Sequence, residues 1–67
     1  MSDASTVAEL AAIADAVDRE LARVRDLATR RAAHAASRGE DAGDDLLAAM
    51  YEAERVLASA SRIVRRA

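Results

Sequence analysis

The sequence predicts an all-α protein: an antiparallel two-helix hairpin of the coiled-coil type, which we expect to self-associate into a four-helix bundle. Residues 7–37 contain no Pro and no Gly, and their apolar side chains recur every three or four positions, as in a coiled-coil helix. A second stretch with the same spacing fills residues 42–66. Only a loop of about four residues separates the two stretches, and so short a loop favours antiparallel helices.

The composition limits the size of the hydrophobic core. Hydrophobic residues make up 52% of the 67 residues, but 19 of them are Ala, which leaves about fourteen large apolar side chains. We assign residues 1–5 to a flexible tail and residues 6–67 to one domain. A single core in so small a chain contributes roughly 3–5 kcal/mol. Because the chain has no Cys, disulfides and thiolate metal sites are excluded, and self-association is the expected source of further stability.

The charge pattern argues for a soluble protein without a strong field. All ten basic residues are Arg, and twelve acidic residues give a net charge of −2, so no large positive surface calls for nucleic acid. The apolar runs are much shorter than the roughly 20 residues that cross a bilayer. The sequence does not begin with basic residues followed by a hydrophobic block, so we expect no signal peptide. We therefore expect a cytoplasmic protein with no membrane contact.

The first helix is expected to span about residues 7–37. Thr6 and Glu9 have the spacing of a capping box, in which each side chain accepts a backbone N–H of the other residue. Gly39 suits the position just past the helix end, where a positive φ is favoured. The residues expected to face the second helix are Val7, Leu10, Ala14, Val17, Leu21, Val24, Ala28, Arg31 and Ala35.

The second helix is expected to follow a loop at about residues 38–41 and to span about residues 42–66. Asp41, Asp44 and Asp45 supply capping oxygens and negative charge at its start. Leu47, Glu54, and Ser61 would then lie at a mostly polar edge. The residues expected to face the first helix are Leu46, Met50, Ala53, Leu57, Ala60, Val64 and Ala67.

The loop length also predicts how the two helices align. It places Ala53 opposite Val24 and Ala60 opposite Val17, so that small side chains meet large ones and the helices can approach closely. The acidic start of the first helix then lies beside the Arg-rich end of the second. This charge pattern disfavours a parallel arrangement.

A second apolar stripe is predicted on one side of this hairpin. Ile13, Leu27, Val56 and Ile63 would lie exposed there, and an exposed apolar patch on so small a protein indicates a contact surface. The simplest partner is another copy, which gives a homodimeric four-helix bundle. The predicted interface residues are Ile13, Glu20, Leu27, His34, Val56 and Ile63.

Two polar members of this set have alternative roles. Glu20 either pairs with an Arg of a partner chain or remains a solvated carboxylate at the rim. His34 is the only imidazole and has no Cys or second His with which to hold a metal ion, so we interpret it as an interfacial or solvated side chain.

The sequence contains no recognisable catalytic set. Asp44 and Asp45 are best explained as residues that start a helix, and Ser59 and Ser61 have no base within helical reach. We therefore predict a protein that is not an enzyme, with no catalytic, metal or cofactor-binding residues.

Arg residues form the one cluster that suggests a ligand. Arg55, Ser59, Arg62 and Arg66 follow one another along a single stripe of the second helix, where guanidinium groups could bind phosphate. Acidic neighbours such as Glu52 and the absence of aromatic stacking partners argue against nucleic acid. We rank this alternative second.

Two resemblances accompany these inferences. Residues 15–21 (DAVDREL), followed by Val24 and Arg30, resemble the first helix of the all-helical chorismate mutases over about a third of the chain. That family also uses a catalytic Lys and a third helix; this sequence has no Lys, and we expect no such activity. The overall plan is similar to that of the plasmid copy-number Rop proteins, helical hairpins that dimerise and bind paired RNA loops.

Taken with the residues, these patterns favour a small regulatory or adaptor protein. We expect it to act by protein–protein binding through its exposed apolar helical face. The alternative is a Rop-like RNA- or nucleotide-binding regulator that uses the Arg stripe.

Overall fold

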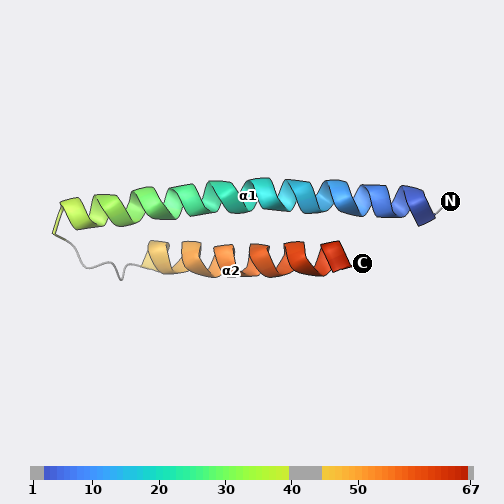
Figure 1. The fold of residues 1–67 in the computed structure, drawn as a ribbon. Coiled ribbons are helices and arrows are strands. Elements are labelled where there is room, and N and C mark those ends of the chain that lie inside the picture. Colours follow the sequence, from blue (N-terminus) through green and yellow to red (C-terminus); the bar gives the residue numbers. More distant parts are fainter. Residues whose placement is uncertain (1–2, 40–44, 67) are drawn as a thin grey trace.

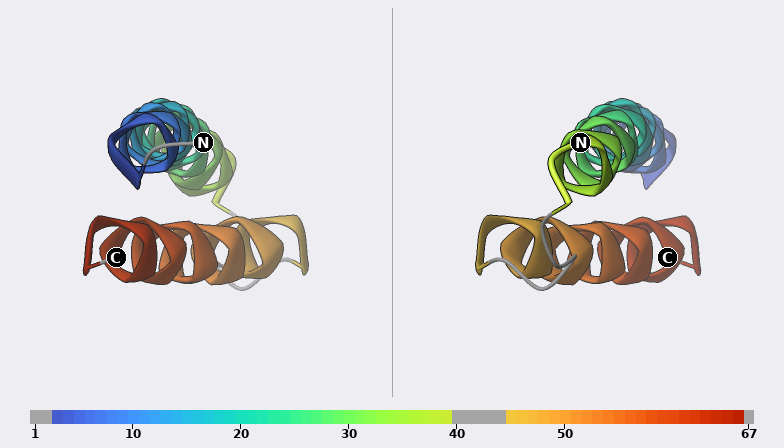
Figure 2. Two further views of the ribbon diagram at one scale, coloured as in Figure 1. Left: turned by 90° about the vertical axis from the view of Figure 1, so that its right-hand side faces the viewer. Right: turned by 90° about the vertical axis from the view of Figure 1, so that its left-hand side faces the viewer.

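A computed structural model describes residues 3–39 and 45–66 and contains two helices in these ranges. Helix α1 spans Asp3–Ser37 and helix α2 spans Asp45–Arg66. The two helices lie side by side and run in opposite directions (Figure 1), in a rod that measures 56 × 14 × 13 Å. Figure 2 shows that their axes cross at an angle. The predicted all-α helical hairpin is confirmed.

Helix α1 begins earlier than the sequence pattern suggested. The helix is described from Asp3, so Asp3–Ser5, which we assigned to a flexible tail, are helical, and Thr6 lies within the helix. Neither Pro nor Gly interrupts this segment, and the negative charge of Asp3 in the first turn interacts favourably with the helix dipole. The capping box at Thr6 was therefore a wrong prediction of the helix start.

The end of α1 matches the prediction. The helix ends at Ser37, and Gly39 follows with a φ of 72°. The backbone N–H of Gly39 donates to the carbonyl of Ala36 at 3.1 Å, and the N–H of Arg38 donates to the carbonyls of His34 and Ala35, each at 3.2 Å. The positive φ that Gly adopts without strain thus closes the last turn.

Helix α2 is described from Asp45 onward. The predicted helix start near residue 42, and residues 40–41 of the predicted loop at residues 38–41, lie outside the described residues. Arg65 and Arg66 close α2 with positive charge, as its dipole favours.

The inward face of α1 is largely the predicted one. Its buried residues are Ala14, Leu21, Ala28 and Ala35. Val7, by contrast, is exposed. The reason is visible in Figure 1, where the start of α1 extends past the end of α2.

The inward face of α2 differs in part from the prediction. Met50, Leu57 and Val64 are half-buried, as expected for residues that face α1. Leu47 and Ser61, which we placed at a polar edge, are buried, whereas Leu46 and Ala53, which we placed in the seam, are exposed. The helix is thus rotated about its axis. Its inner row, as we call the residues that face α1, consists of Leu47, Met50, Glu54, Leu57, Ser61 and Val64.

Polar contacts with α1 account for this rotation. The hydroxyl of Ser61 donates to Asp18 Oδ1 at 2.6 Å, and Arg25 Nε lies 3.8 Å from Glu54 Oε1. Each contact joins the residues that directly follow a predicted pair, Val17 with Ala60 and Val24 with Ala53. The predicted antiparallel alignment along the helix axes therefore holds to about one residue, while the rotation of α2 was wrong because apolar character alone was used to place it.

Candidate protein-binding surface

The rotation of α2 leaves an uninterrupted row of apolar residues on its outer side. We call it the outer row, and its members are Leu46, Ala49, Ala53, Val56, Ala60 and Ile63. Ala60 is half-buried and the other five residues are exposed. The three large members are 50–58% exposed. Burying one such side chain fully stabilises a complex by roughly 1.5–3 kcal/mol, so this row can supply substantial binding energy.

The outer row is more apolar than the row that α2 turns toward α1. The inner row contains Glu54 and Ser61, and every residue of the outer row is Ala or a larger aliphatic residue. If α2 served only to complete the hairpin, turning the outer row toward α1 would stabilise it more, because apolar burial dominates packing energy. The outer row therefore has the character of a second buried face that has no partner within the hairpin.

Helix α1 adds two large apolar side chains to the same side of the molecule. Ile13 and Leu27 directly precede the buried Ala14 and Ala28, just as Val56 precedes the inward Leu57 on α2. In an antiparallel pair, residues that precede the seam project to the same side on both helices. The predicted stripe residues Ile13 and Leu27 are 52% and 45% exposed.

The polar residues of the predicted interface contact neighbours three or four residues away in the sequence. Arg23 Nη1 donates to Glu20 Oε1 at 3.2 Å, an exposed pair that contributes roughly 0.2–1 kcal/mol. His34 is exposed, and its Nε2 lies 3.5 Å from Arg38 Nη1. The structure thus places Glu20 and His34 on the surface, Glu20 beside Arg23 of α1 and His34 beside Arg38, which directly follows α1.

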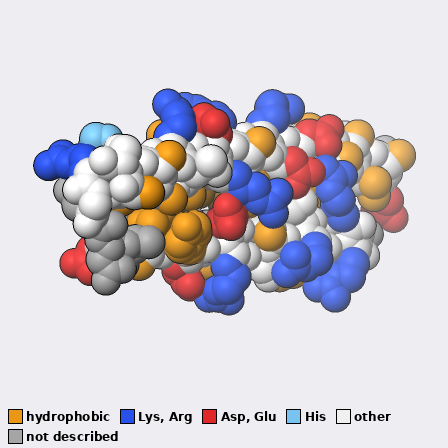
Figure 3. Space-filling model, turned by 60° about the vertical axis from the view of Figure 1, so that its left-hand side comes forward, with side chains coloured by type: hydrophobic (Ala, Val, Ile, Leu, Met, Phe, Trp, Pro, Cys, Tyr) orange, Lys and Arg blue, Asp and Glu red, His pale blue; other side chains and the backbone are white. Residues whose placement is uncertain are grey.

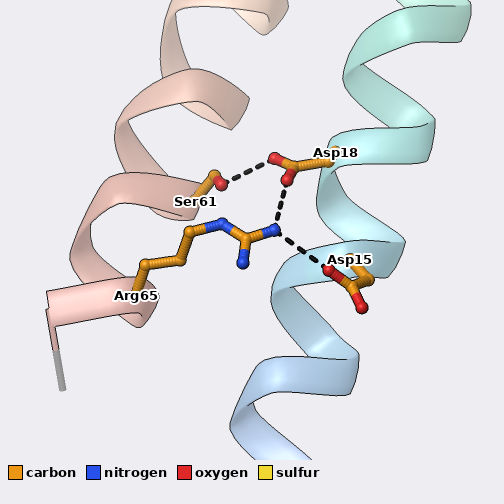
Figure 4. A network of polar contacts seen from close by, with 4 residues as sticks. All are labelled: Asp15, Asp18, Ser61 and Arg65. Atoms are coloured by element: carbon orange, nitrogen blue, oxygen red, sulfur yellow. Dashed lines mark hydrogen bonds and ion pairs between the residues drawn. The ribbon is translucent and has the colours of Figure 1, made fainter.

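A cluster of four polar side chains joins the N-terminal half of α1 to the end of α2 (Figure 4). We call Asp15, Asp18, Ser61 and Arg65 the polar cluster. In addition to the bond from Ser61 to Asp18, Arg65 Nη2 donates to Asp15 Oδ1 at 3.0 Å and also to Asp18 Oδ2. Acidic residues in the N-terminal half of α1 thus lie beside the Arg-rich end of α2, as the predicted antiparallel arrangement requires.

The electrostatics of the polar cluster favour its charged state. The hydrogen bond from Ser61, followed by the contact with Arg65, lowers the pKa of Asp18 below its ordinary value. The same contact, with Asp18 first and Asp15 second, raises the pKa of Arg65. Both groups are therefore ionised at neutral pH, and the cluster connects the helices without presenting a reactive acid or base.

The residues of the predicted phosphate-binding stripe have different surroundings. Arg55 Nε donates to Glu52 Oε2 at 3.1 Å, and this pair lowers the pKa of Glu52 and raises that of Arg55. Ser59 is half-buried. Arg62 and Arg66 are exposed and make no ion pair with any described residue. Two of the four predicted residues therefore present uncompensated positive charge.

Charged and apolar side chains divide the surface in a visible way. On the face drawn in Figure 3, hydrophobic side chains gather near the loop end of the hairpin, and Arg and acidic side chains intersperse over the rest. Within the described ranges, no group of three or more acidic or His residues could hold a metal ion. Neither described helix has a stretch long and apolar enough to cross a membrane.

Comparisons with known proteins give no match to this chain, whether with protein-family models, curated proteins or solved structures.

Sequence reasoning missed three residues of the outer row, Leu46, Ala53 and Ala60, because it placed them in the seam. A signal for them was present, because the outer row repeats at coiled-coil spacing without a single polar interruption. It also missed the polar cluster. Its signal was the pairing of Asp15 and Asp18 with Arg65 on positions that flank the predicted seam, where opposite charges commonly meet.

Proposed function

We propose that this protein is a small, non-enzymatic regulatory or adaptor protein that acts by protein–protein binding. Its contact surface is the outer row of α2 together with Ile13 and Leu27 of α1. The observation that carries the proposal is the outward orientation of the row of α2 that contains only apolar residues. Exposed contiguous apolar surface on a small chain is typical of an interaction site.

The energetics of the hairpin support this proposal. Leu47 is the only large side chain that is fully buried among the described residues, and the rest of the buried set is mostly Ala. Five large aliphatic side chains of the proposed surface, by contrast, remain about half exposed. A partner that covered them would contribute roughly 1.5–3 kcal/mol for each side chain that it buried fully.

Sedimentation of the purified protein at several concentrations tests whether the surface binds a second copy. We expect the wild-type chain to associate, and Leu27→Glu to be monomeric and less helical at micromolar concentration, because a carboxylate is costly to bury beside Glu20. Tyr51→Glu is the matched control, since Tyr51 is exposed outside both rows of α2. A wild-type chain that stays monomeric and fully folded would exclude a second copy as the partner of this surface.

A second candidate function is binding of RNA or another phosphate-bearing ligand. The observation that favours it is the exposure of Arg62 and Arg66 without an acidic partner among the described residues. Titration with labelled RNA and DNA at low salt tests it. Affinity that falls steeply with salt and is lost in Arg62→Ala would support this function, and the absence of binding at low salt would exclude it.

A further inference from the structure

We propose that the outer row of α2 binds the outer row of a second copy of this chain in the antiparallel orientation. This inference rests on the proposed function and names its partner and geometry. The two hairpins are related by a two-fold axis that passes the midpoint of α2, near Glu54 and Arg55. Three features of the described residues lead to this arrangement.

The first feature is that the outer row complements itself when reversed. An antiparallel alignment sets Leu46 against Ile63 of the partner subunit and Ala53 against Val56 of the partner subunit, while Ala49 meets Ala60 of the partner subunit. Every layer is then apolar on both sides, and the Ala residues near the centre let the helix axes approach closely. A two-fold axis produces each of these contacts twice, as an isologous interface requires.

The second feature is the charge along the outer edge of this row. Asp45, Glu52, Ser59 and Arg66 follow each other at intervals of seven residues, so they form one edge that is acidic at the start of α2 and basic at its end. An antiparallel partner brings Asp45 beside Arg66 of the partner subunit. Neither residue has an ion-pair partner among the described residues of its own chain. A parallel partner would instead place like charges together at both ends.

The third feature is the angle between the two rows of α2. Each outer-row residue directly precedes an inner-row residue, so the two rows point about 100° apart around the helix. A partner α2 on the outer row therefore lies nearly at a right angle to the direction of α1. The partner's α1 then lies beside α1 on the side that carries Ile13 and Leu27, and the four helices form a square bundle.

Thiol cross-linking tests the orientation, because the chain has no Cys of its own. Leu46→Cys and Ile63→Cys change residues that are 55% and 58% exposed in the hairpin, so each variant should fold normally. We expect mild oxidation of their mixture to give mainly the mixed disulfide. Disulfides between identical variants would indicate a parallel pairing and would overturn the inference, as would the absence of any cross-linked product.

A charge exchange tests the same arrangement without new thiols. Arg66→Glu and Asp45→Arg should each raise the dissociation constant of the dimer by about tenfold, because each places like charges together at both ends of the interface. The double variant should restore the wild-type dissociation constant. If the double variant is as weak as the single ones, Asp45 and Arg66 do not meet across the interface.

These outcomes separate the inference from the proposed function. If the chain sediments as a dimer but the disulfides form between identical variants, the proposed function stands and the antiparallel pairing is wrong. If the chain is monomeric at every concentration, a second copy is not its partner. Binding of a different purified protein, abolished by Val56→Glu and kept in Tyr51→Glu, would then assign the surface to that protein and overturn this inference.

Discussion

At the scale of single residues, the neighbours Leu46 and Leu47 decide how the molecule is organised. They are chemically identical and adjacent, yet Leu47 is fully buried and Leu46 is 55% exposed. The apolar pattern alone permits either residue to face α1. The bonds that Asp18 makes with Ser61 and Arg65 favour the orientation in which Leu47 faces α1, because they form only when α2 is turned to bring Ser61 inward.

Replacement of each Leu by Ala should therefore have unequal effects. Leu47→Ala opens a cavity in the contact between the helices and should lower the free energy of unfolding by about 2–5 kcal/mol. Leu46→Ala should cost much less within a single hairpin. Urea unfolding at a concentration where the chain is monomeric compares them, and equal losses would mean that α2 is not rotated as described.

The polar cluster predicts a specific dependence of stability on pH. Because folding lowers the pKa of Asp18, its charged form stabilises the folded chain. This stabilisation is complete above the ordinary carboxyl pKa of about 4 and is lost as the pH falls through the lowered pKa of the folded state.

Thermal unfolding of the wild-type chain and of Asp18→Asn at a series of pH values measures this effect. We expect the wild-type chain to have the higher Tm at pH 7 and the difference to shrink as the solution is acidified below about pH 4. Other carboxylates titrate in both proteins, so the difference between them reports on Asp18. A difference that stays constant down to the lowest pH would contradict the role assigned to the cluster.

At the scale of the helices, α1 is the longer template on which α2 is placed. Its 35 residues extend about 52 Å, whereas the 22 residues of α2 extend about 33 Å. Small buried residues such as Ala14 and Ala28 let α2 approach closely. The helical span of α1 after its first turn could be predicted from periodicity, and its end at Ser37 could be predicted from Gly39. The antiparallel alignment could also be predicted.

The rotation of α2 could not be predicted in the same way. Two overlapping apolar rows run along this helix, and hydrophobicity alone favours the one without Glu54 and Ser61. Choosing correctly requires the partners of those polar groups on the other helix, Arg25 and Asp18, which periodicity within one helix does not reveal. The exposed positions of Ile13 and Leu27 were accessible from the sequence because the face of α1 was assigned correctly.

Gly39 gives the sharpest test of the helix connection. A Cβ at this position would meet no atom within 4 Å, so the strain of Gly39→Ala comes from the positive φ alone. We expect a loss of about 1 kcal/mol in the free energy of unfolding. Gly39→Asn should lose less, because Asn tolerates this backbone conformation better. Equal losses on chemical unfolding would show that the positive φ does not matter for stability.

At the scale of the whole molecule, the hairpin covers only one of the two faces of α2 that carry large apolar residues. One face of α2 is joined to α1 by polar contacts and by Leu47, and the adjacent face is apolar and uncovered. In this arrangement the polar contacts orient α2 on α1 although the core has few large residues, and apolar side chains remain available to bind a partner. We propose that the uncovered face is the contact surface of the protein and that a second copy of the chain covers it.

The dependence of Tm on protein concentration tests this claim most directly, because a chain that gains stability from a second copy unfolds at higher temperature when concentrated. We predict that the Tm of the wild-type chain rises with concentration, that Val56→Glu abolishes the rise, and that Tyr51→Glu preserves it. A wild-type Tm that is the same at all concentrations, equal to that of Val56→Glu, would contradict the account.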